Sequence, residues 1–203
     1  MELPENPLNI QEVIQEINVD DILQRSHVVA LPMRVKFRGI TTREALLING
    51  PKGWGEFSPF TEYKPQEAKH WLRAGLEAAY LGLPEAEGAV PVNGTVPAVQ
   101  PQDVEAVLER FPGVQTFKIK VPVGVVKQAP LGGVRRTLQL AKELNLQLTV
   151  ASALDTAVGI DAGLVAAKLT GSRAAGLATQ RLFVEDVAPE RQLDNGTLHL
   201  THT

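Results

Sequence analysis

Residues 91–121 read PVNGTVPAVQPQDVEAVLERFPGVQTFKIKV, and this stretch decides the fold class. The segments VNGTVPAV and TFKIKV are rich in Val, Thr and Ile, which favour β-strands. Between them, DVEAVLERF places its apolar residues on one face of a helix. A strand, a helix and a second strand in this order form a β-α-β unit. The stretch therefore predicts an α/β fold with a parallel sheet.

The same alternation continues towards the C-terminus. We expect a strand at 125–131, a helix at 134–144 and a strand at 146–154. A helix rich in Gly and Ala, ending near Leu169, and a short strand at 174–179 follow. This order is typical of a β/α domain rather than of a β-sandwich.

The N-terminal part has a different pattern. HVVALPMRVKF (27–37) and REALLI (43–48) are strand-like, and WGEF (54–57) follows a turn and completes the core of an antiparallel hairpin. Beyond Pro65, apolar residues recur at helical spacing until the chain nears Gly82. These features predict an α+β domain over residues 1–90 and a β/α domain over residues 91–203.

The composition restricts the function. Lys and Arg number 20 and Asp and Glu 23, for a net charge of −3, so no surface for nucleic acid is indicated. No segment approaches the roughly 20 apolar residues of a membrane span, and the acidic N-terminus is unlike a secretory leader. Cysteine is absent, which suits a reducing compartment. We therefore expect a cytoplasmic protein that binds neither nucleic acid nor membrane.

Three lysines are candidates for chemistry. Lys118 and Lys120 stand two residues apart on a predicted strand, so both side chains point to one face. At the end of a barrel strand, like-charge repulsion and desolvation would lower a lysine pKa towards that of a general base. The alternative is a solvated edge strand with surface lysines. Lys127 lies inside the apolar run 125–129, where a lone lysine requires an explanation.

Two short loops are candidates for ligand binding. Gly132 and Gly133 open a predicted helix, whose N–H groups favour an anion, but a plain strand-to-helix turn explains both glycines equally well. The segment Ser152–Thr156 ends a predicted strand and supplies small hydroxyls and one carboxylate. Its alternative role is to cap the following helix. Zinc-ligand spacing is not found among the four histidines, which are His27, His70, His199 and His202.

Five stretches in order resemble the o-succinylbenzoate synthases of the enolase superfamily, in particular the actinobacterial type. They lie at 27–63, 91–99, 111–121, 125–135 and 150–164. The resemblance implies an N-terminal capping domain over a modified (β/α) barrel and a step of menaquinone biosynthesis. In that step, 2-succinyl-6-hydroxy-2,4-cyclohexadiene-1-carboxylate loses water to give o-succinylbenzoate. The implied ligand is therefore a small-molecule carboxylate.

The resemblance also implies roles for individual residues. Lys120 matches the lysine that removes the proton α to the carboxylate and then protonates the departing hydroxide, and Lys118 matches its partner. Lys127 matches the lysine on the opposite side of the substrate, which stabilises the enediolate. Cap loops 36–40 and 56–63 match regions that line the substrate pocket. The same holds for the segment that contains Ser152, Ala153 and Leu154, and we add Gly132 and Gly133 to this set.

The implied Mg²⁺ site is the main departure from the family. In the family, three acidic ligands lie one each on strands between the strand of Lys120 and that of Lys127. Here Val121–Gly124 joins those two strands directly, with no room for three β/α units. About five strands result where a closed barrel needs eight. The sequence therefore predicts an incomplete barrel, and it supplies no metal ligands that we can name.

Three functions remain open. The first is an o-succinylbenzoate synthase-like lyase that depends on Mg²⁺. The second is a catalytically inactive deletion remnant, or an interaction protein on a half-barrel scaffold. The third is an N-acylamino acid racemase-like activity, which uses the same two lysines. Because an open parallel sheet exposes unpaired backbone groups, we also expect a homo-oligomer that pairs through the open sheet edges.

Overall fold

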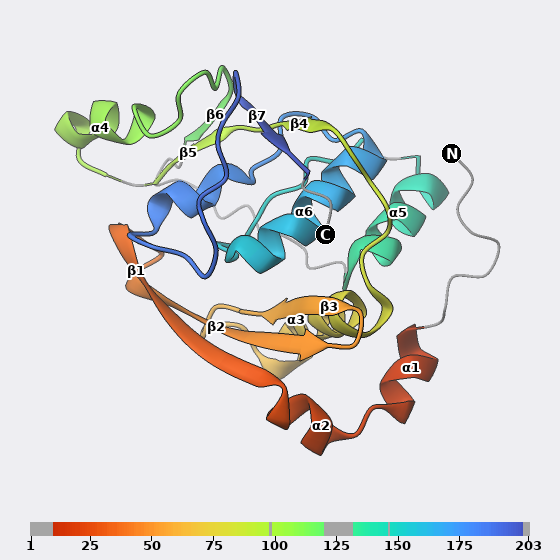
Figure 1. Ribbon diagram of the computed structural model, residues 1–203. Helices are drawn as coiled ribbons and strands as arrows, with labels where there is room; N and C mark the ends of the chain where they lie inside the picture. The colour runs from red at the N-terminus through yellow and green to blue at the C-terminus, as the bar shows by residue number, and fades with distance from the viewer. Residues whose placement is uncertain (1–9, 98, 120–131, 146, 201–203) are drawn as a thin grey trace.

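The computed structural model describes residues 10–97, 99–119, 132–145 and 147–200 (Figure 1). A three-stranded sheet forms one side of the molecule, and α5 (Val134–Glu143) and α6 (Ala157–Thr170) lie over it (Figure 1). The mixed α/β class predicted from the sequence is confirmed. Within the described ranges, no helix is long and apolar enough to cross a membrane.

The sheet is the antiparallel hairpin predicted for the N-terminal part. It consists of β1 (Ser26–Phe37), β2 (Ile40–Gly50) and β3 (Gly53–Phe57) in that order. Arg38 and Gly39 connect β1 to β2 with φ of 48° and 85°. Positive φ at both central residues is typical of the type I′ turn, whose twist matches that of the two strands. Residues 36–40 therefore form the loop at the C-terminal end of β1.

Two short N-terminal helices, α1 (Ile10–Glu16) and α2 (Val19–Gln24), were not predicted. The side chain of Asn18 accepts a hydrogen bond of 2.8 Å from the backbone N–H of Asp20 and so caps α2. Ile14 and Ile22 pack against a small core formed by Ile48, Leu76 and Ala79. The helices are too short for a clear periodic signal, and packing against the sheet stabilises them.

The predicted amphipathic helix is confirmed as α3 (Pro65–Leu76), which continues as a π-helical turn, η1 (Glu77–Leu81). It packs backbone to backbone on the sheet. A Cβ atom added to Gly55 would lie 1.9 Å from the carbonyl oxygen of Gly75. Glycine is therefore required where α3 crosses β3, and this contact fixes the height of α3 above the strand.

The second half contains the predicted parallel arrangement in part. β5 (Gly94–Val96) and β6 (Phe117–Ile119) pair in parallel, with Thr95 opposite Lys118. Between them lie the 3₁₀ turn η2 (Pro101–Asp103) and α4 (Val104–Leu108). Parallel bridges join Val92 to Ala175 and Ala151 to Gly176. Four segments thus lie side by side in the order 151, 175–176, 92–96 and 117–119, and within the described ranges they do not close into a barrel.

Two predicted strands were wrong in extent. The described residues 147–154 and the segment 174–179 contribute only isolated bridges, and the chain then forms η3 (Ala178–Leu182). Backbone bonds join them at one point, where the N–H of Ser152 donates to the carbonyl of Gly176 at 3.0 Å and the N–H of Gly176 donates to that of Val150 at 2.8 Å. The N–H of Val150 instead donates to the Ser172 hydroxyl, at 3.0 Å. The predicted strand 125–131 lies outside the described residues. The domain boundary at residue 90 falls inside β4 (Ala89–Pro91) and stays a prediction.

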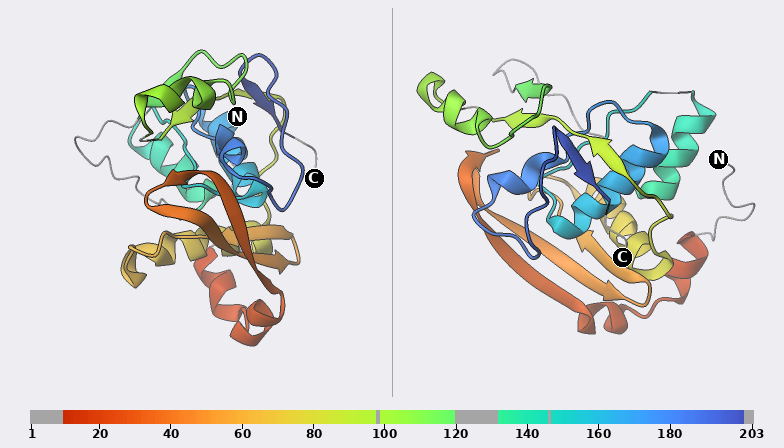
Figure 2. Two further views of the ribbon diagram at one scale, coloured as in Figure 1. Left: turned by 90° about the vertical axis from the view of Figure 1, so that its left-hand side faces the viewer. Right: turned by 45° about the horizontal axis from the view of Figure 1, so that its top comes forward.

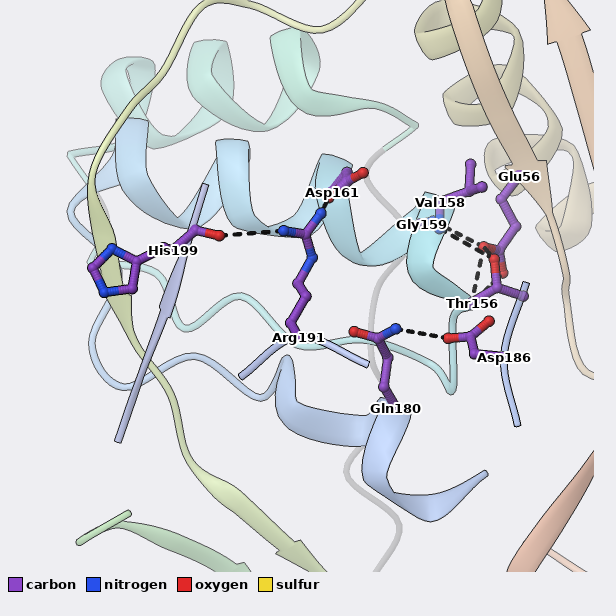
Figure 3. A network of polar contacts seen from close by, with 9 residues as sticks. All are labelled: Glu56, Thr156, Val158, Gly159, Asp161, Gln180, Asp186, Arg191 and His199. Carbon is purple, nitrogen blue, oxygen red and sulfur yellow. Dashed lines mark hydrogen bonds and ion pairs between the residues drawn. The ribbon is translucent and has the colours of Figure 1, made fainter. Parts of the chain in front are cut away.

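An antiparallel pair that the sequence did not indicate joins β4 to β7 (Thr197–His199) near the C-terminus. Arg191 holds the preceding segment against α6, because its guanidinium pairs with Asp161 and donates to the carbonyl of His199 at 3.2 Å (Figure 3).

The main hydrophobic core spans both halves of the chain. It includes Leu31, Phe37 and Phe60 from the first half and Phe111, Leu154, Leu164 and Phe183 from the second.

We expect Gly55→Ala to lower the free energy of unfolding by about 3 kcal/mol, the upper end of the usual cost of overpacking. The reason is that the new methyl group meets rigid backbone of α3. Gly171→Ala is the control, since nothing lies within 4 Å of its Cβ and its φ of 60° alone costs about 1 kcal/mol. Urea unfolding measures both values. Equal losses for the two variants would contradict the backbone contact.

Candidate functional site

The carboxylate of Glu56, at the end of β3, lies against the first turn of α6 (Figure 3). It accepts hydrogen bonds from the backbone N–H of Thr156 at 3.0 Å and of Gly159 at 2.9 Å, and from the Thr156 hydroxyl at 2.7 Å. The Ser58 hydroxyl donates to its other oxygen at 2.5 Å. The free N–H groups and positive end of the helix dipole favour such an anion. Glu56 therefore binds the N-terminal part of the fold to α6.

Local sequence makes room for this carboxylate. Thr156 is the N-cap of α6, with extended backbone and a side chain that accepts from Val158 N–H at 3.3 Å. This confirms the capping role weighed for the segment Ser152–Thr156. A Cβ on Gly159 would lie 2.8 Å from Glu56 Oε2. The glycine in the first turn of α6 thus leaves the space that the carboxylate occupies.

Arg43, on β2, holds the other side of the same loop. Its Nε donates to the carbonyl of Leu154 at 3.1 Å, and its Nη2 donates to the carbonyls of Ala153, at 3.2 Å, and Ser58. The guanidinium also lies 4.4 Å from the ring centre of Phe60. The side chain is buried, which lowers the pKa of Arg43 against the opposing effect of the carboxyl groups of Asp155, Glu56 and Glu62.

Asp155 is the second carboxyl group beside Arg43. Burial first, and then repulsion from Glu56, raise the pKa of Asp155 to about 7, although Arg43 and the N–H of Ala153 act in the opposite direction. The Ala153 N–H donates to the Asp155 carboxyl at 3.3 Å. Near neutral pH the two carboxyl groups therefore share the field of one guanidinium, and Asp155 takes up a proton easily.

A second glutamate repeats the arrangement at α5. Glu77, in η1, accepts from the backbone N–H of Arg135 at 3.0 Å, and a Cβ on Gly133 would lie 2.3 Å from its Oε2. Burial raises the pKa of Glu77, while the bond from the Arg135 N–H lowers it. Arg73 donates to the carbonyl of Gly132. The anion that the Gly-Gly turn admits in this structure is thus a side chain of the protein.

A cavity of about 340 Å³ lies between α3, β3 and the helices α5 and α6. Polar groups of Glu56, Ser58, His70 and Asp155 line part of it, together with Thr137. The structure brings three of the predicted ligand-binding residues to this cavity, namely Ala153, Gly132 and Gly133. Its size is that of a small-molecule site.

The other predicted residues lie elsewhere. The Ser152 hydroxyl is 2.5 Å from that of Thr179, and Leu154 is buried in the core with a φ of 65°. Lys118 lies on β6, and its side chain is exposed. Even so, partial desolvation lowers the pKa of Lys118, and repulsion from Arg38 adds to this effect. Lys120 and Lys127 fall outside the described residues, and their roles stay predictions.

Sequence reasoning did not single out Arg43, Glu56 or Glu77, although Glu56 belongs to the cap loop 56–63 that was expected to line the pocket. Arg43 and Glu56 lie within predicted strands, Glu77 lies among the polar residues of the predicted helix, and each side chain is at least nine-tenths buried. A buried charge is costly unless it is paired or hydrogen-bonded. For Arg43 and Glu56, a charge inside a strand-like segment was the available signal, but it does not reveal the partner.

The described residues do not fit a Mg²⁺ site. No group of three or more His, Cys, Asp or Glu side chains able to hold a metal lies within the described ranges. Glu56 already accepts hydrogen bonds from four donors, and the raised pKa of Asp155 opposes the ionised form that a metal ligand needs. Both carboxyl groups therefore serve the structure.

We expect the stability of the fold to fall as the pH rises from about 5 to 7. The folded-state pKa of Asp155, about 7, exceeds the value of 3.8 for the free group, so the folded protein binds more protons than the unfolded chain in this window. The slope reaches up to about 1.4 kcal/mol per pH unit. Asp155→Asn should remove the part of this slope that Asp155 causes, whereas Asp103→Asn, at an exposed site, should keep the whole slope. Urea unfolding at several pH values measures it, and an unchanged slope in Asp155→Asn would contradict the burial of this carboxyl group.

The comparisons with known proteins agree on one superfamily. A family model described as enolase N-terminal domain-like matches residues 28–79. Among solved structures, an enolase family member from Agrobacterium tumefaciens with homology to dipeptide epimerases has a TM-score of 0.64 at 13% identity, over 87% of this chain and 97% of that one. A muconate lactonizing enzyme has a TM-score of 0.62 at 14% identity, over 88% and 93%. At these identities the likeness shows the fold alone.

Curated relatives are closer in sequence. The o-succinylbenzoate synthase of Mycolicibacterium smegmatis is 36% identical over 278 aligned positions, which cover 89% of this chain and 87% of the relative. The enzymes of Mycobacterium leprae and Mycobacterium tuberculosis are 36% and 32% identical, over 83% and 91% of this chain and 80% and 87% of their own. Because 278 positions exceed the 203 residues of the chain, the alignment crosses a stretch that this chain lacks, in agreement with the predicted incomplete barrel. The chain belongs to the o-succinylbenzoate synthase family of the enolase superfamily.

Proposed function

We propose that this chain is a carbon–oxygen lyase that forms o-succinylbenzoate from 2-succinyl-6-hydroxy-2,4-cyclohexadiene-1-carboxylate in menaquinone biosynthesis. The observation that carries the proposal is the identity of 32–36% to curated o-succinylbenzoate synthases over 83–91% of the chain. We place the reaction in the cytoplasm, because a chain without cysteine suits a reducing compartment.

The reaction removes one molecule of water. We propose that Lys120 takes the proton α to the carboxylate and returns it to the departing hydroxide, with Lys127 as a fixed cation across the ring. Lys118 precedes the base by two residues in the sequence, and its pKa is lowered by desolvation first and by the charge of Arg38 second. Arg38 brings a second positive charge to the same end of the molecule, where the β1–β2 turn lies beside β5 and β6 (Figure 2). Two cations suit a substrate with two carboxylates.

The Mg²⁺ site is the part of the proposed mechanism that the described residues do not supply. Loss of the α proton builds further negative charge on a carboxylate, which members of the superfamily offset with Mg²⁺. The described residues offer no ligand set for it, as shown above. We propose that the ligands lie on the stretch that the aligned relatives carry and this chain lacks.

This mismatch favours a second candidate function. In it, the chain is an inactive deletion remnant or an interaction protein that keeps the cap and the substrate loops. The specific observation is that Glu56, a carboxylate at the junction of the two halves, is fully engaged in hydrogen bonds to α6 and Ser58. The racemase-like alternative requires the same proton abstraction and depends on the same missing ligands.

Turnover of the cyclohexadiene substrate tests these functions, followed as formation of the aromatic product with saturating Mg²⁺ and then with EDTA. We expect the unaltered chain to be slower by roughly a thousandfold or more than a variant that carries the missing stretch of the Mycolicibacterium smegmatis enzyme between Val121 and Gly124, because the stretch restores several kcal/mol of charge stabilisation. EDTA should abolish the gain.

Matched controls accompany the insertion. Lys120→Ala in the inserted variant should remove turnover, and N-acylamino acid epimerisation measured in parallel separates the synthase from the racemase. An inserted variant that folds but forms no product would contradict the proposed lyase function. Equal rates with and without the stretch would contradict our account of the metal ligands.

We further propose that the chain forms a homo-oligomer through the outer edge of its parallel segments. One edge of β6 pairs with β5, and no strand within the described residues pairs with the other edge of β6. Light scattering after size-exclusion chromatography should give a mass of at least twice 22.0 kDa. A monomer at every concentration tested would rule out this assembly.

A further inference from the structure

Loop 152–156 (Ser152–Thr156) needs support from outside its own sequence. Leu154 has a φ of 65°, in the left-handed region that residues with a Cβ rarely adopt, and its side chain is buried. A non-glycine residue persists in this conformation only where surrounding contacts hold it. The loop also lines the cavity through Ala153 and Asp155.

The support comes from the N-terminal half of the chain, on both sides of Leu154. Arg43 donates to the carbonyls of Ala153 and Leu154, at a separation of 110 or more residues. Glu56 accepts from the N–H and hydroxyl of Thr156, 100 residues away. Both charged side chains are buried, so these hydrogen bonds form away from water, where they are strongest.

Ser58 connects the two charged residues. Its carbonyl accepts from the Arg43 guanidinium, and its hydroxyl donates to the Glu56 carboxylate. The position of one charged group therefore constrains that of the other. Asp155 lies in the same field, because both Arg43 and Glu56 influence its charge. The four residues form one hydrogen-bonded and electrostatic unit between the two halves.

We propose that Arg43 and Glu56 are positioning residues, which together fix the backbone of loop 152–156 so that it lines the substrate pocket. The inference rests on the proposed function for the ligand, an aromatic dicarboxylate. Arg43 and Glu56 need not touch that ligand. They set the direction of the loop carbonyls and of the first N–H groups of α6, and thereby the wall that the ligand meets.

The test measures the dissociation constant of o-succinylbenzoate by calorimetry, at a temperature at which every variant is fully folded. We expect Arg43→Lys and Glu56→Gln each to weaken binding by roughly tenfold, about the effect of losing one charge-assisted hydrogen bond. Glu44→Gln is the control, since Glu44 is the exposed neighbour of Arg43 on β2. Thr156→Val should weaken binding in the same way, and Thr156→Ser, which keeps the hydroxyl donor to Glu56, should restore it.

Hydrogen exchange of the Thr156 and Gly159 amides reports the loop independently of any ligand. Faster exchange in Glu56→Gln but not in Glu44→Gln supports the proposal, and so does weaker binding confined to the loop variants. Unchanged affinity in folded Arg43→Lys and Glu56→Gln overturns the positioning role. If the parent chain binds no o-succinylbenzoate, the ligand assigned under the proposed function is wrong. Amide exchange then decides alone, and unchanged exchange in Glu56→Gln overturns the proposal.

Discussion

Two buried glutamates from the first half of the chain hold the first turns of two helices from the second half. Glu56 reaches α6, and Glu77 reaches α5. Each carboxylate satisfies N–H groups that no residue within the helix can satisfy, and each meets the positive end of a helix dipole. Without them, buried donors would be left unpaired at both helix starts, at a cost larger than that of a typical surface contact. Both glutamates line the cavity, and Glu56 also bonds to Thr156 in loop 152–156, so the shape of the cavity and of the loop depends on them.

Local features were predictable from the sequence, and long-range ones were not. The hairpin of β1 and β2 and the helices α3 and α5 follow from strand and helix periodicity within short windows, and α6 was predicted from its composition, rich in Gly and Ala. The partner of Glu56 lies 100 residues away, and no periodicity encodes it. The described residues 147–154 show the opposite failure, because their strand-like composition yields a single bridge, at Ala151, and the N–H of Val150 donates to the Ser172 hydroxyl.

In the candidate site, too, only some of the residues were predictable from the sequence. Family resemblance named Ala153, and the turn before a predicted helix named Gly132 and Gly133, and the structure brings all three to one cavity. It did not indicate that Arg43 would bind the loop carbonyls, because an arginine within a strand is equally typical of a solvated edge. The carboxyl groups near the site, Glu56 and Asp155, are used to assemble the fold. The contacts that hold the fold together are therefore separate from the residues that would carry out the reaction. Within the described residues, the contacts that join the N-terminal part to α6 are the ones present.

The separation of 100 residues between Glu56 and Thr156 has a consequence for the entropy of the unfolded chain. Forming this contact closes a long loop, and the cost of closure grows only with the logarithm of loop length. The stretch that the relatives carry would lengthen the loop by no more than about a doubling, which changes the closure cost by about 0.6 kcal/mol. Loss of that stretch therefore changes the entropic cost of bringing the two halves together only slightly. The loss affects stability almost wholly through the strand pairing and apolar burial that the stretch would otherwise contribute.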